Sequence, residues 1–485
     1  MRMRGYPSGS QAWLRLLVLS SLLLALTVSP AEAANPADTA SSAGMLSLDQ
    51  AVHRALAQTP EMLEARARLD EAKGGVREAR GHLLPSLSAS LMGSGSDNPL
   101  NVFGMKLSQG KATFNDFGAN QFLGPQSLST APDNLNDPGW YRNYQTKLTL
   151  QIPVYNGGQI WGGLAQARAY LAAARQGDVA ARQHLLFEVL GAYAGVGAAQ
   201  AFVGVAGKAI AAADAYVKLS EQLFAQGVVS KSDVLRAKLH LANARLQSQE
   251  ARNALENQLA RLRMMVGLPA DVPVRLAQRV SVVLPAADLT ALRRQGVTDN
   301  PGVRARLLQV EAARAGVDKA RASYLPHFNI QISREWNSPS LDGGRPSYTV
   351  AGVLTWNVFD FGARRGALDG AEARVMQRQA EARKAREQTV LAVDKAWREV
   401  RLAAIRESTR EQAIGEAAEA ERLARLRYEK GVSTIAELLA SQAELDKTRS
   451  QLVAARYQAV MARAGLLLAT GRLSLSALRT SPAQP

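Results

Sequence analysis

Four segments of the chain alternate between apolar and polar residues. In the first of them Leu87, Ala89 and Leu91 point to one side of an extended backbone, and serines point to the other. Segments of roughly ten residues are long enough to cross a membrane as tilted strands. A half-buried strand of a soluble sandwich alternates in the same way, so the pattern alone leaves both interpretations open. The predicted strands are at about residues 85–93, 143–154, 326–336 and 347–358.

The pattern changes from alternating to helical directly after the second and the fourth of these segments. No proline occurs from Asn156 to about Gln226 or from Asp360 to Lys430. Each stretch has about 70 residues and would form a helix of roughly 105 Å. Helices of this length cannot lie inside a globule, so we expect them to form a coiled-coil tower.

Proline, glycine and polar residues mark the places where strands and helices meet. Pro85 and Pro326 end the preceding helices, because proline lacks an N–H and clashes with the turn before it. Asn156 and Asp360 are the predicted N-caps of the two long helices. The residues predicted at these strand–helix junctions are Pro85, Asn156, Gly157, Gly158, Pro326, Asp360 and Gly362.

The chain contains a twofold internal repeat. Thr59-Pro60 matches Asn300-Pro301 at an offset of 241, and residues 224–228 match residues 428–432 at an offset of 204. The difference of 37 residues indicates an insertion in the first copy, at about 93–139, where turn-forming residues are abundant. The predicted segments are a first repeat over 46–279, a second repeat over 280–473 and a C-terminal tail over 474–485.

Both long helices end in the same kind of tip. A glycine stands where glycine commonly ends a helix, and three residues later an [ST]-x-x-[DE] capping box begins the next helix. We therefore predict two matching helical hairpins, with tips at 224–233 and 428–437. The residues of these signals are Gly227, Ser230 and Asp233 in the first copy, and Gly431, Thr434 and Glu437 in the second.

The N-terminus predicts export, which changes the interpretation of the net charge. Residues 1–33 combine a basic start, the apolar run 16–28 and the cleavage signal Ala31-Glu32-Ala33, the pattern of a signal peptide, with a linker expected over 34–45. The chain has 58 Lys and Arg against 42 Asp and Glu, a net charge of +16. An exported chain rarely meets nucleic acid, so we expect no nucleic-acid partner and assign the charge mainly to a solvated helical surface.

Composition argues against an enzyme. The absence of cysteine excludes disulfides, cysteine-ligated metals and cysteine nucleophiles. The five histidines are scattered, without the spacing of a metal site. Asp360-Phe361-Gly362 contains a kinase tripeptide without its companion motifs. We expect no catalytic residues, no bound metal and no cofactor.

The order of these features resembles the TolC family of outer-membrane efflux channels. Signal peptide, twofold repeat, paired strands, the sequence Pro-Val-Tyr-Asn-Gly-Gly at residues 153–158 and the glycine tips carry the resemblance over about residues 46–473. It implies a mainly α fold with β: a long α-helical coiled-coil barrel plus a β-barrel segment with four strands per protomer. It also implies a homotrimer in the outer membrane, with the helices in the periplasm, in contact with outer-membrane lipid, a periplasmic adaptor (membrane fusion protein) and an inner-membrane pump.

The resemblance implies a gate at the tips. Asp233, Tyr428 and Glu437 match polar gate positions of the family, whereas Ser433 and Ala440 depart from the residues of some members. Helix capping is the alternative role of Asp233 and Glu437. Packing is the alternative for Tyr428, because a phenylalanine, residue 224, takes its place in the first copy.

The implied function is passive export through the exit duct of a tripartite efflux or type I secretion machine. The alternative is a soluble periplasmic coiled-coil scaffold or adaptor. Adaptors carry a compact β-domain between the helices of their hairpin, whereas the strands predicted here lie at the far helix ends. The cargo, whether drug, metal or protein, is open.

The resemblance also places the insertion and several basic residues at the outer end of the barrel. The insertion at 93–139 is expected to face the cell exterior or to fold over the barrel mouth. Arg142, Arg334 and Arg345 are candidates for contact with lipopolysaccharide phosphates near the rim.

Overall fold

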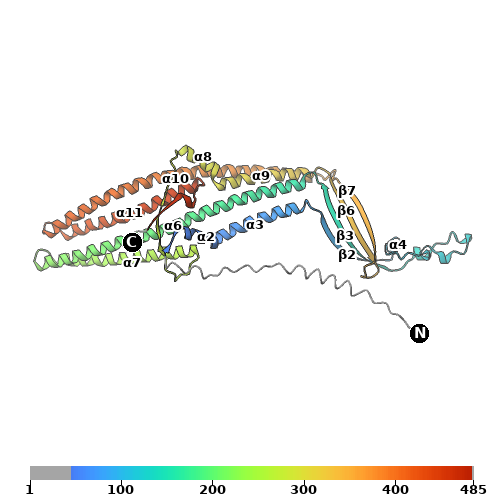
Figure 1. Cartoon of the computed structure of the whole chain (residues 1–485), viewed down its shortest axis with the longest axis horizontal. Coiled ribbons are helices and arrows are strands. Elements are labelled where there is room, and N and C mark those ends of the chain that lie inside the picture. Colours follow the sequence, from blue (N-terminus) through green and yellow to red (C-terminus); the bar gives the residue numbers. More distant parts are fainter. Residues whose placement is uncertain (1–44, 483–485) are drawn as a thin grey trace, which may run out of the picture. The chain divides into compact units, whose positions relative to one another are not determined.

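The computed structural model describes residues 45–482, and these residues form mostly helices together with strands (Figure 1). The predicted signal peptide, residues 1–33, lies outside the described residues, as does nearly all of the predicted linker over 34–45. The mixture of long helices and short strands is the one that the two hydrophobic periods predict.

The two long helices have the same length and matching positions in the two halves of the chain. Helix α6 (Gln159–Ala225) and helix α10 (Ala363–Glu429) each have 67 residues. Each begins and ends at matching positions, offset by 204 residues. The shorter helices are α2 (Leu48–Gln58), α3 (Pro60–Gly81), α7 (Lys231–Val266), α8 (Leu289–Asp299), α9 (Pro301–Ala322) and α11 (Ile435–Ala469).

Two shorter helices follow one another along each long helix. Helices α3 and α7 pack along α6, and α9 and α11 pack along α10 (Figure 1). The two halves join because α9 and α11 also pack against α6. Proline begins both α3 and α9, where its missing N–H costs no helical hydrogen bond.

The two long helices differ strongly in burial. Helix α6 buries residues from Leu164 to Leu223, among them Leu190 and Tyr193, which pack with α2 and α7 in the largest hydrophobic cluster. Helix α10 buries far fewer side chains along the same length. They are Ala371, Ala382, Val393, Ala403, Ala424 and Tyr428. Helix α6 is therefore the central helix of the described fold, and α10 lies at its surface.

The four predicted strands form one antiparallel sheet in the order β2-β3-β6-β7. Each observed strand lies within three residues of its prediction at either end. In this order β2 and β7 are the edge strands. The strands are β2 (Ser86–Ser96), β3 (Tyr141–Tyr155), β6 (His327–Ser338) and β7 (Arg345–Thr355).

The connection between β2 and β3 contains structure of its own, whereas the turn between β6 and β7 is short. The elements of this connection are α4 (Pro99–Ser108), η2 (Phe114–Phe117), η3 (Ala119–Gln121), η4 (Pro125–Ser127) and α5 (Asp133–Asn136). Figure 1 shows it at the end of the sheet that is remote from the helices.

Short strands pack beside the helices α6 and α11. Strand β5 (Gln278–Val282) pairs with β8 (Leu478–Pro482), so residues 478–482 of the predicted C-terminal tail belong to a strand pair. Strand β5 also spans the predicted boundary between the repeats at 279 and 280. The remaining elements are β1 (Met45–Leu46), β4 (Arg275–Leu276) and η5 (Leu475–Ala477).

Among the described residues, α6 and α11 each contain an 18-residue stretch long and apolar enough to cross a membrane. A third of each stretch (33%) is buried inside the fold. Both helices supply residues to the main hydrophobic cluster, for example Leu186 and Leu467. Helix packing therefore already uses part of their apolar surface.

Candidate functional site

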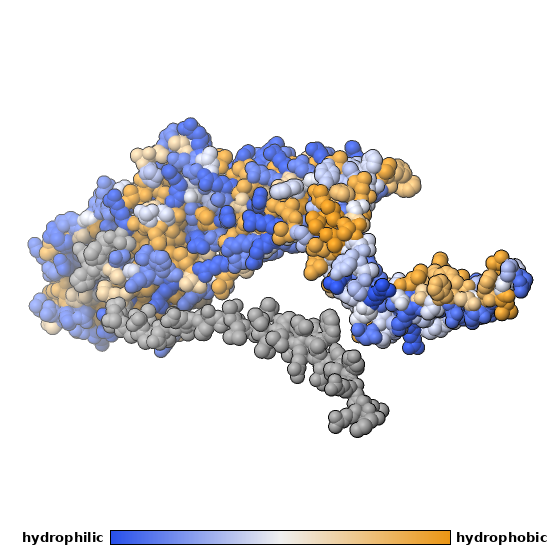
Figure 2. All heavy atoms as spheres, turned by 45° about the vertical axis from the view of Figure 1, so that its right-hand side comes forward, coloured by the Kyte–Doolittle hydropathy of each residue, from blue (hydrophilic) through white to orange (hydrophobic). Residues whose placement is uncertain are grey.

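The sheet has one apolar face and one polar face. The register places Leu87, Leu150, Ile332 and Val350 in one row across the four strands, and Ser88, Thr149, Ser333 and Thr349 in a neighbouring row on the opposite face. The apolar face is uncovered: Leu87 is 71% exposed and Val350 is 72% exposed. Figure 2 shows hydrophobic atoms gathered over the sheet. Such a surface is normally covered by lipid or by another protein.

The polar face carries two groups of hydrogen-bonded side chains. Lys147 and Glu335 form an ion pair at 2.5 Å, and Gln145 donates to the same carboxylate at 2.9 Å. Nearer the insertion, the Asn143 amide donates to the Asn337 side chain at 2.8 Å. These groups lie on paired strands, so the register alone brings them together. A polar face of this kind suits a water-filled interior.

Aromatic side chains flank the apolar face at both ends. Trp336 and Tyr348 lie at the end near the insertion, and Phe328 and Trp356 lie at the end near the helices. Tyr348 and Trp356 are eight residues apart, about 27 Å along an extended strand. Aromatic side chains concentrate at the two interfaces of a bilayer in the same way.

The three arginines predicted near the rim do not share one face. Arg334 lies on the apolar face, with its guanidinium 4.7 Å from the Trp336 ring and 4.9 Å from the Tyr348 ring. Arg142 lies on the apolar face as well. Arg345 is on the polar face, next to Gly110 of the insertion. The alternation of β7 thus directs the Arg345 side chain to the face opposite the one that carries Arg142 and Arg334.

The long helices begin two residues later than predicted, after a short turn. The N-cap residues are Gly158 and Gly362, not Asn156 and Asp360. In each junction two residues with positive φ separate the strand from the helix, at 157–158 and 361–362. Asn156 and Asp360 reach across this turn instead, and each accepts a hydrogen bond from the N–H four residues later, at 3.3 and 3.2 Å.

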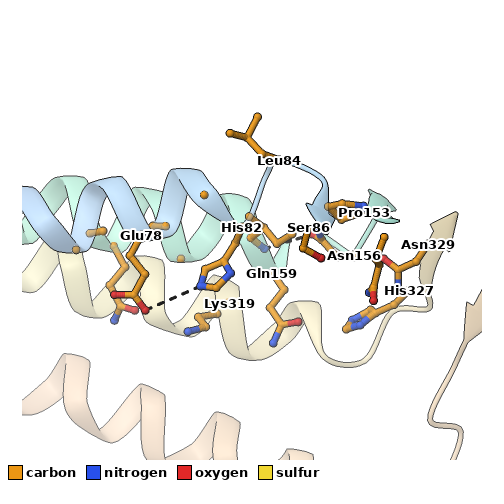
Figure 3. A pocket seen from close by; sticks show the side chains of 18 of the residues that line it. Glu78, His82, Leu84, Ser86, Pro153, Asn156, Gln159, Lys319, His327 and Asn329 are labelled. Atoms are coloured by element: carbon orange, nitrogen blue, oxygen red, sulfur yellow. Dashed lines mark hydrogen bonds and ion pairs between the residues drawn. The ribbon is translucent and has the colours of Figure 1, made fainter. Parts of the chain in front are cut away.

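The first junction also forms the wall of an open cavity of about 610 Å³ (Figure 3). Gln159 and Lys319 come from helices α6 and α9, and His82 directly follows α3. Ser86 and His327 are the first residues of their strands and lie on the polar face. Pro85 and Pro326 precede these strands directly. The cavity therefore connects the polar face of the sheet with the helices.

Both tips end their long helix by the same backbone geometry. Gly227 and Gly431 have φ of +74° and +69°, a conformation that glycine adopts without steric cost. Beyond each glycine, the N–H of Val228 or Val432 donates to a carbonyl five residues earlier, at 2.9 Å. This is the Schellman ending that the glycine signals predict.

The two capping signals differ from each other. Asp233 accepts hydrogen bonds from the Ser230 N–H at 3.0 Å and hydroxyl at 2.9 Å. At the second tip Thr434 accepts from the Glu437 N–H at 3.4 Å, but the Glu437 carboxylate does not return to the cap. It pairs with Arg427 at 2.7 Å instead. The prediction of two matching boxes is therefore wrong for the second tip, because the arginine offers a stronger, charged donor.

Tyr428 is a core residue of the described fold. Its side chain is 1% exposed, whereas Phe224, its counterpart in the first copy, is 46% exposed. The Ser220 hydroxyl donates to the Tyr216 carbonyl at 2.7 Å, so the Tyr428 hydroxyl donates to Ser220, 3.1 Å away. Burial raises the pKa of Tyr428 above its ordinary value. The phenol therefore stays neutral and holds the two hairpins together.

A second buried network near the tips had no signal in the sequence. The Tyr216 hydroxyl donates to the Glu421 carboxylate and lies 2.9 Å from the Gln442 side chain, which is 2% exposed. The Gln442 amide donates to Asp446 at 2.7 Å. Burial, together with Glu421, raises the pKa of Tyr216. These residues join α6 to α10 and α11, and Tyr216 and Glu421 are 205 positions apart in the chain.

Comparison with known proteins gives a consistent set of matches. The model of the outer membrane efflux protein family matches residues 51–268 and 293–472. Protein CyaE of Bordetella pertussis is 28% identical over 313 residues, which are 62% of this chain and 65% of CyaE. The alkaline protease secretion protein AprF of Pseudomonas aeruginosa is 28% identical over 199 residues, 40% of each chain. The matches thus span less than two thirds of either relative.

The fold has solved counterparts. The outer membrane protein VceC of Vibrio cholerae superposes with a TM-score of 0.71 at 21% identity, over 87% of this chain and 96% of VceC. This likeness concerns the arrangement of the helices and strands.

Gly157 is the junction residue that tolerates a side chain least. A Cβ there would lie 2.6 Å from the Ala322 carbonyl oxygen, whereas a Cβ at Gly158 would meet no atom within 4 Å. Both residues have positive φ, which costs an alanine roughly 1–2 kcal/mol. We expect Gly157→Ala to lower the thermal unfolding midpoint clearly more than Gly158→Ala. Equal shifts would contradict the close approach.

Tyr216→Phe removes the hydroxyl from the buried network. The Glu421 carboxylate loses its donor, so we expect a loss of about 1–3 kcal/mol in unfolding free energy. Tyr457→Phe is the matched control on α11, since its hydroxyl makes no hydrogen bond to any described residue. Thermal unfolding in detergent measures both. Equal stability of the two variants would show that the network contributes nothing.

Proposed function

Because the chain belongs to the outer membrane efflux protein family, we propose that it is the outer-membrane exit duct of a tripartite efflux or secretion machine. Substrate delivered by an inner-membrane pump and a periplasmic adaptor leaves passively through it. The sheet lies in the outer membrane and the helices extend into the periplasm. The single observation that carries this proposal is the two-faced sheet with open edges.

An isolated copy of this sheet is not stable in lipid. The outer edges of β2 and β7 leave rows of N–H and C=O groups unpaired within the described residues, and such groups cost several kcal/mol each in a bilayer. The sheet is antiparallel throughout, so β2 and β7 run in opposite directions. Strand β2 of one copy can therefore pair in antiparallel fashion with β7 of the next copy, and a ring of copies leaves no edge.

The number of copies follows from the need for a pore. Two copies of the four-stranded sheet supply eight strands, a barrel whose interior side chains fill. Three copies supply twelve strands and leave room for solute. A homotrimer built from two structural repeats per protomer is therefore the smallest assembly that conducts.

The helices support the same assembly. Helix α10 has 67 residues, about 100 Å of length, and buries only six of them in its own chain. Isolated long helices gain most of their stability from tertiary packing. Neighbouring copies packed side by side into a helical tunnel supply the missing contacts.

The tips are the proposed periplasmic gate and the place where the adaptor docks. Gly227 and Gly431 shape the turns, Ser230 and Thr434 cap the returning helices, and none of these roles needs a partner. Glu437 is exposed and already carries an ion pair with Arg427 across the second tip. We assign the gate contact to Glu437 and Asp233, and a packing role to Tyr428.

Two further points separate this proposal from its alternatives. A soluble periplasmic scaffold would have to cover the apolar face of the sheet, where Leu87, Val350 and Leu354 are all more than half exposed.

The similarity to AprF, named as a protease secretion protein, favours a secreted polypeptide as cargo.

A matched pair of arginine substitutions tests the membrane assignment. Val350 and Thr349 are adjacent in β7, and the alternation places them on opposite faces. Val350→Arg puts a charge in lipid, at a cost of about 2–4 kcal/mol near the bilayer centre. We expect this variant to be lost from outer membranes, and Thr349→Arg to insert and to alter ion selectivity in planar bilayers. A soluble periplasmic wild-type protein, or equal tolerance of both variants, would contradict the proposal.

A further inference from the structure

The helix α4 of the insertion is attached to the sheet at both of its ends. At its start, the Asn98 N–H donates to the Ser96 hydroxyl at 3.0 Å, at the end of β2. At its other end, the Gln109 amide donates to the Arg142 carbonyl at 2.9 Å and to the Asn143 side chain at 3.0 Å, at the beginning of β3. The helix therefore lies across the end of the sheet that is remote from the long helices (Figure 1).

The attachment is on the polar face. Asn143 alternates with the apolar-face residue Tyr144, and it bonds to Asn337 of β6 on the polar side. Gln109 of the insertion and Asn143 and Asn337 of the sheet are 6%, 7% and 5% exposed, whereas Ser88 and Thr349 on the same face of the sheet are exposed. The Tyr141 hydroxyl also donates to Gln109, at 3.0 Å. Polar groups are buried here because α4 occupies the space in front of them.

The same segment extends to the far edge of the sheet. Gly110, directly after Gln109, has φ of +66°, and a Cβ on it would lie 2.7 Å from a guanidinium nitrogen of Arg345 at the start of β7. The contacts of the segment thus run from the end of β2 to the start of β7, over the whole width of the four strands.

The insertion has a core that holds α4 in shape. Lys106 and Asp116 pair at 2.6 Å, with side chains only 17% and 10% exposed. Lys106 and the Thr113 N–H hold the pKa of the Asp116 carboxyl below its usual value. Val102 is fully buried, and the rings of Phe103 and Phe117 meet edge to face at 5.2 Å. A segment packed in this way keeps a defined shape.

We propose that α4 is the size-selecting element at the outer mouth of the channel and that Gln109 is the residue that anchors it. The proposal rests on the proposed function, in which the polar face lines the pore. Each copy then places one α4 against the inner wall at the mouth. The β6–β7 turn has no comparable segment, so this constriction belongs to the first half of each chain alone.

The absence of cysteine allows a direct test that is independent of the periplasmic tips. Ser88→Cys places one thiol on the polar face, eight residues along β2 from Ser96. Intact bacteria are treated with a small maleimide and with maleimides on polyethylene glycol chains of increasing length, which cannot cross the outer membrane. Leu341→Cys in the β6–β7 turn, 71% exposed, reports outer access in every background.

Two changes remove the obstruction. In the first, residues 97–140 are replaced by a copy of the turn 338–344; in the second, Gln109→Ala deletes the anchor. In both backgrounds we expect long polymers to label Ser88→Cys severalfold faster. We also expect the longest polymer that reaches this thiol to be longer than in the unchanged protein. Gln126→Ala is the control, because its amide bonds only to Leu123 within the insertion. If the replacement fails to assemble into outer membranes, the comparison of Gln109→Ala with Gln126→Ala tests the role of α4 by itself.

The failures are distinguishable. An identical size limit in all backgrounds, with Leu341→Cys labelled throughout, would overturn the role of α4 and leave the channel intact. Absence of labelling at Leu341→Cys from outside the cell would overturn the proposed function itself.

Discussion

An antiparallel sheet with two open edges and one uncovered apolar face is the constraint on which the rest of this structure depends. Lipid satisfies the apolar face, but it offers no partner to a backbone N–H or C=O. The edges of β2 and β7 can be satisfied only by other strands, and the chain supplies none for them within its described residues. The protomer is thus complete as a folded chain and incomplete as a membrane structure.

The helical part has the same dependence in a weaker form. Helix α6 is surrounded by α3, α7, α9 and α11 and carries most of the core, whereas α10 buries only six residues, although α8, α9 and α11 pack along it. Exposed ion pairs such as Arg422 with Glu419 keep that surface soluble but contribute little stability. The buried network around Tyr216 and Tyr428 fixes the two hairpins to each other within one chain. In the proposed trimer, contacts between chains are then left to α10 and the edge strands.

Local sequence patterns predicted much of this architecture. Alternation located the four strands, and the prolines and glycines located α3, α9 and both tips, because each acts on the backbone of its own neighbourhood. Some predictions that needed a choice between nearby partners were wrong. Asn156 and Asp360 proved to lie before a two-residue turn, and Glu437 took Arg427 as its partner. Contacts across long separations, such as Gln109 with Asn143 or Tyr216 with Glu421, leave no periodic trace in a sequence.

Closure of the sheet between copies is the central claim, and disulfide crosslinking between the edge strands measures it most directly. Cysteines at single positions along β2 and β7, combined pairwise in the cysteine-free chain, scan the unknown register of the joint. The two edges of one protomer are about 14 Å apart across three strand spacings, too far for a bridge within a chain. Oxidation in outer membranes should give covalent species up to a closed trimer for at least one pair. Products that remain monomeric for every pair, or that extend beyond the trimer, would contradict the account.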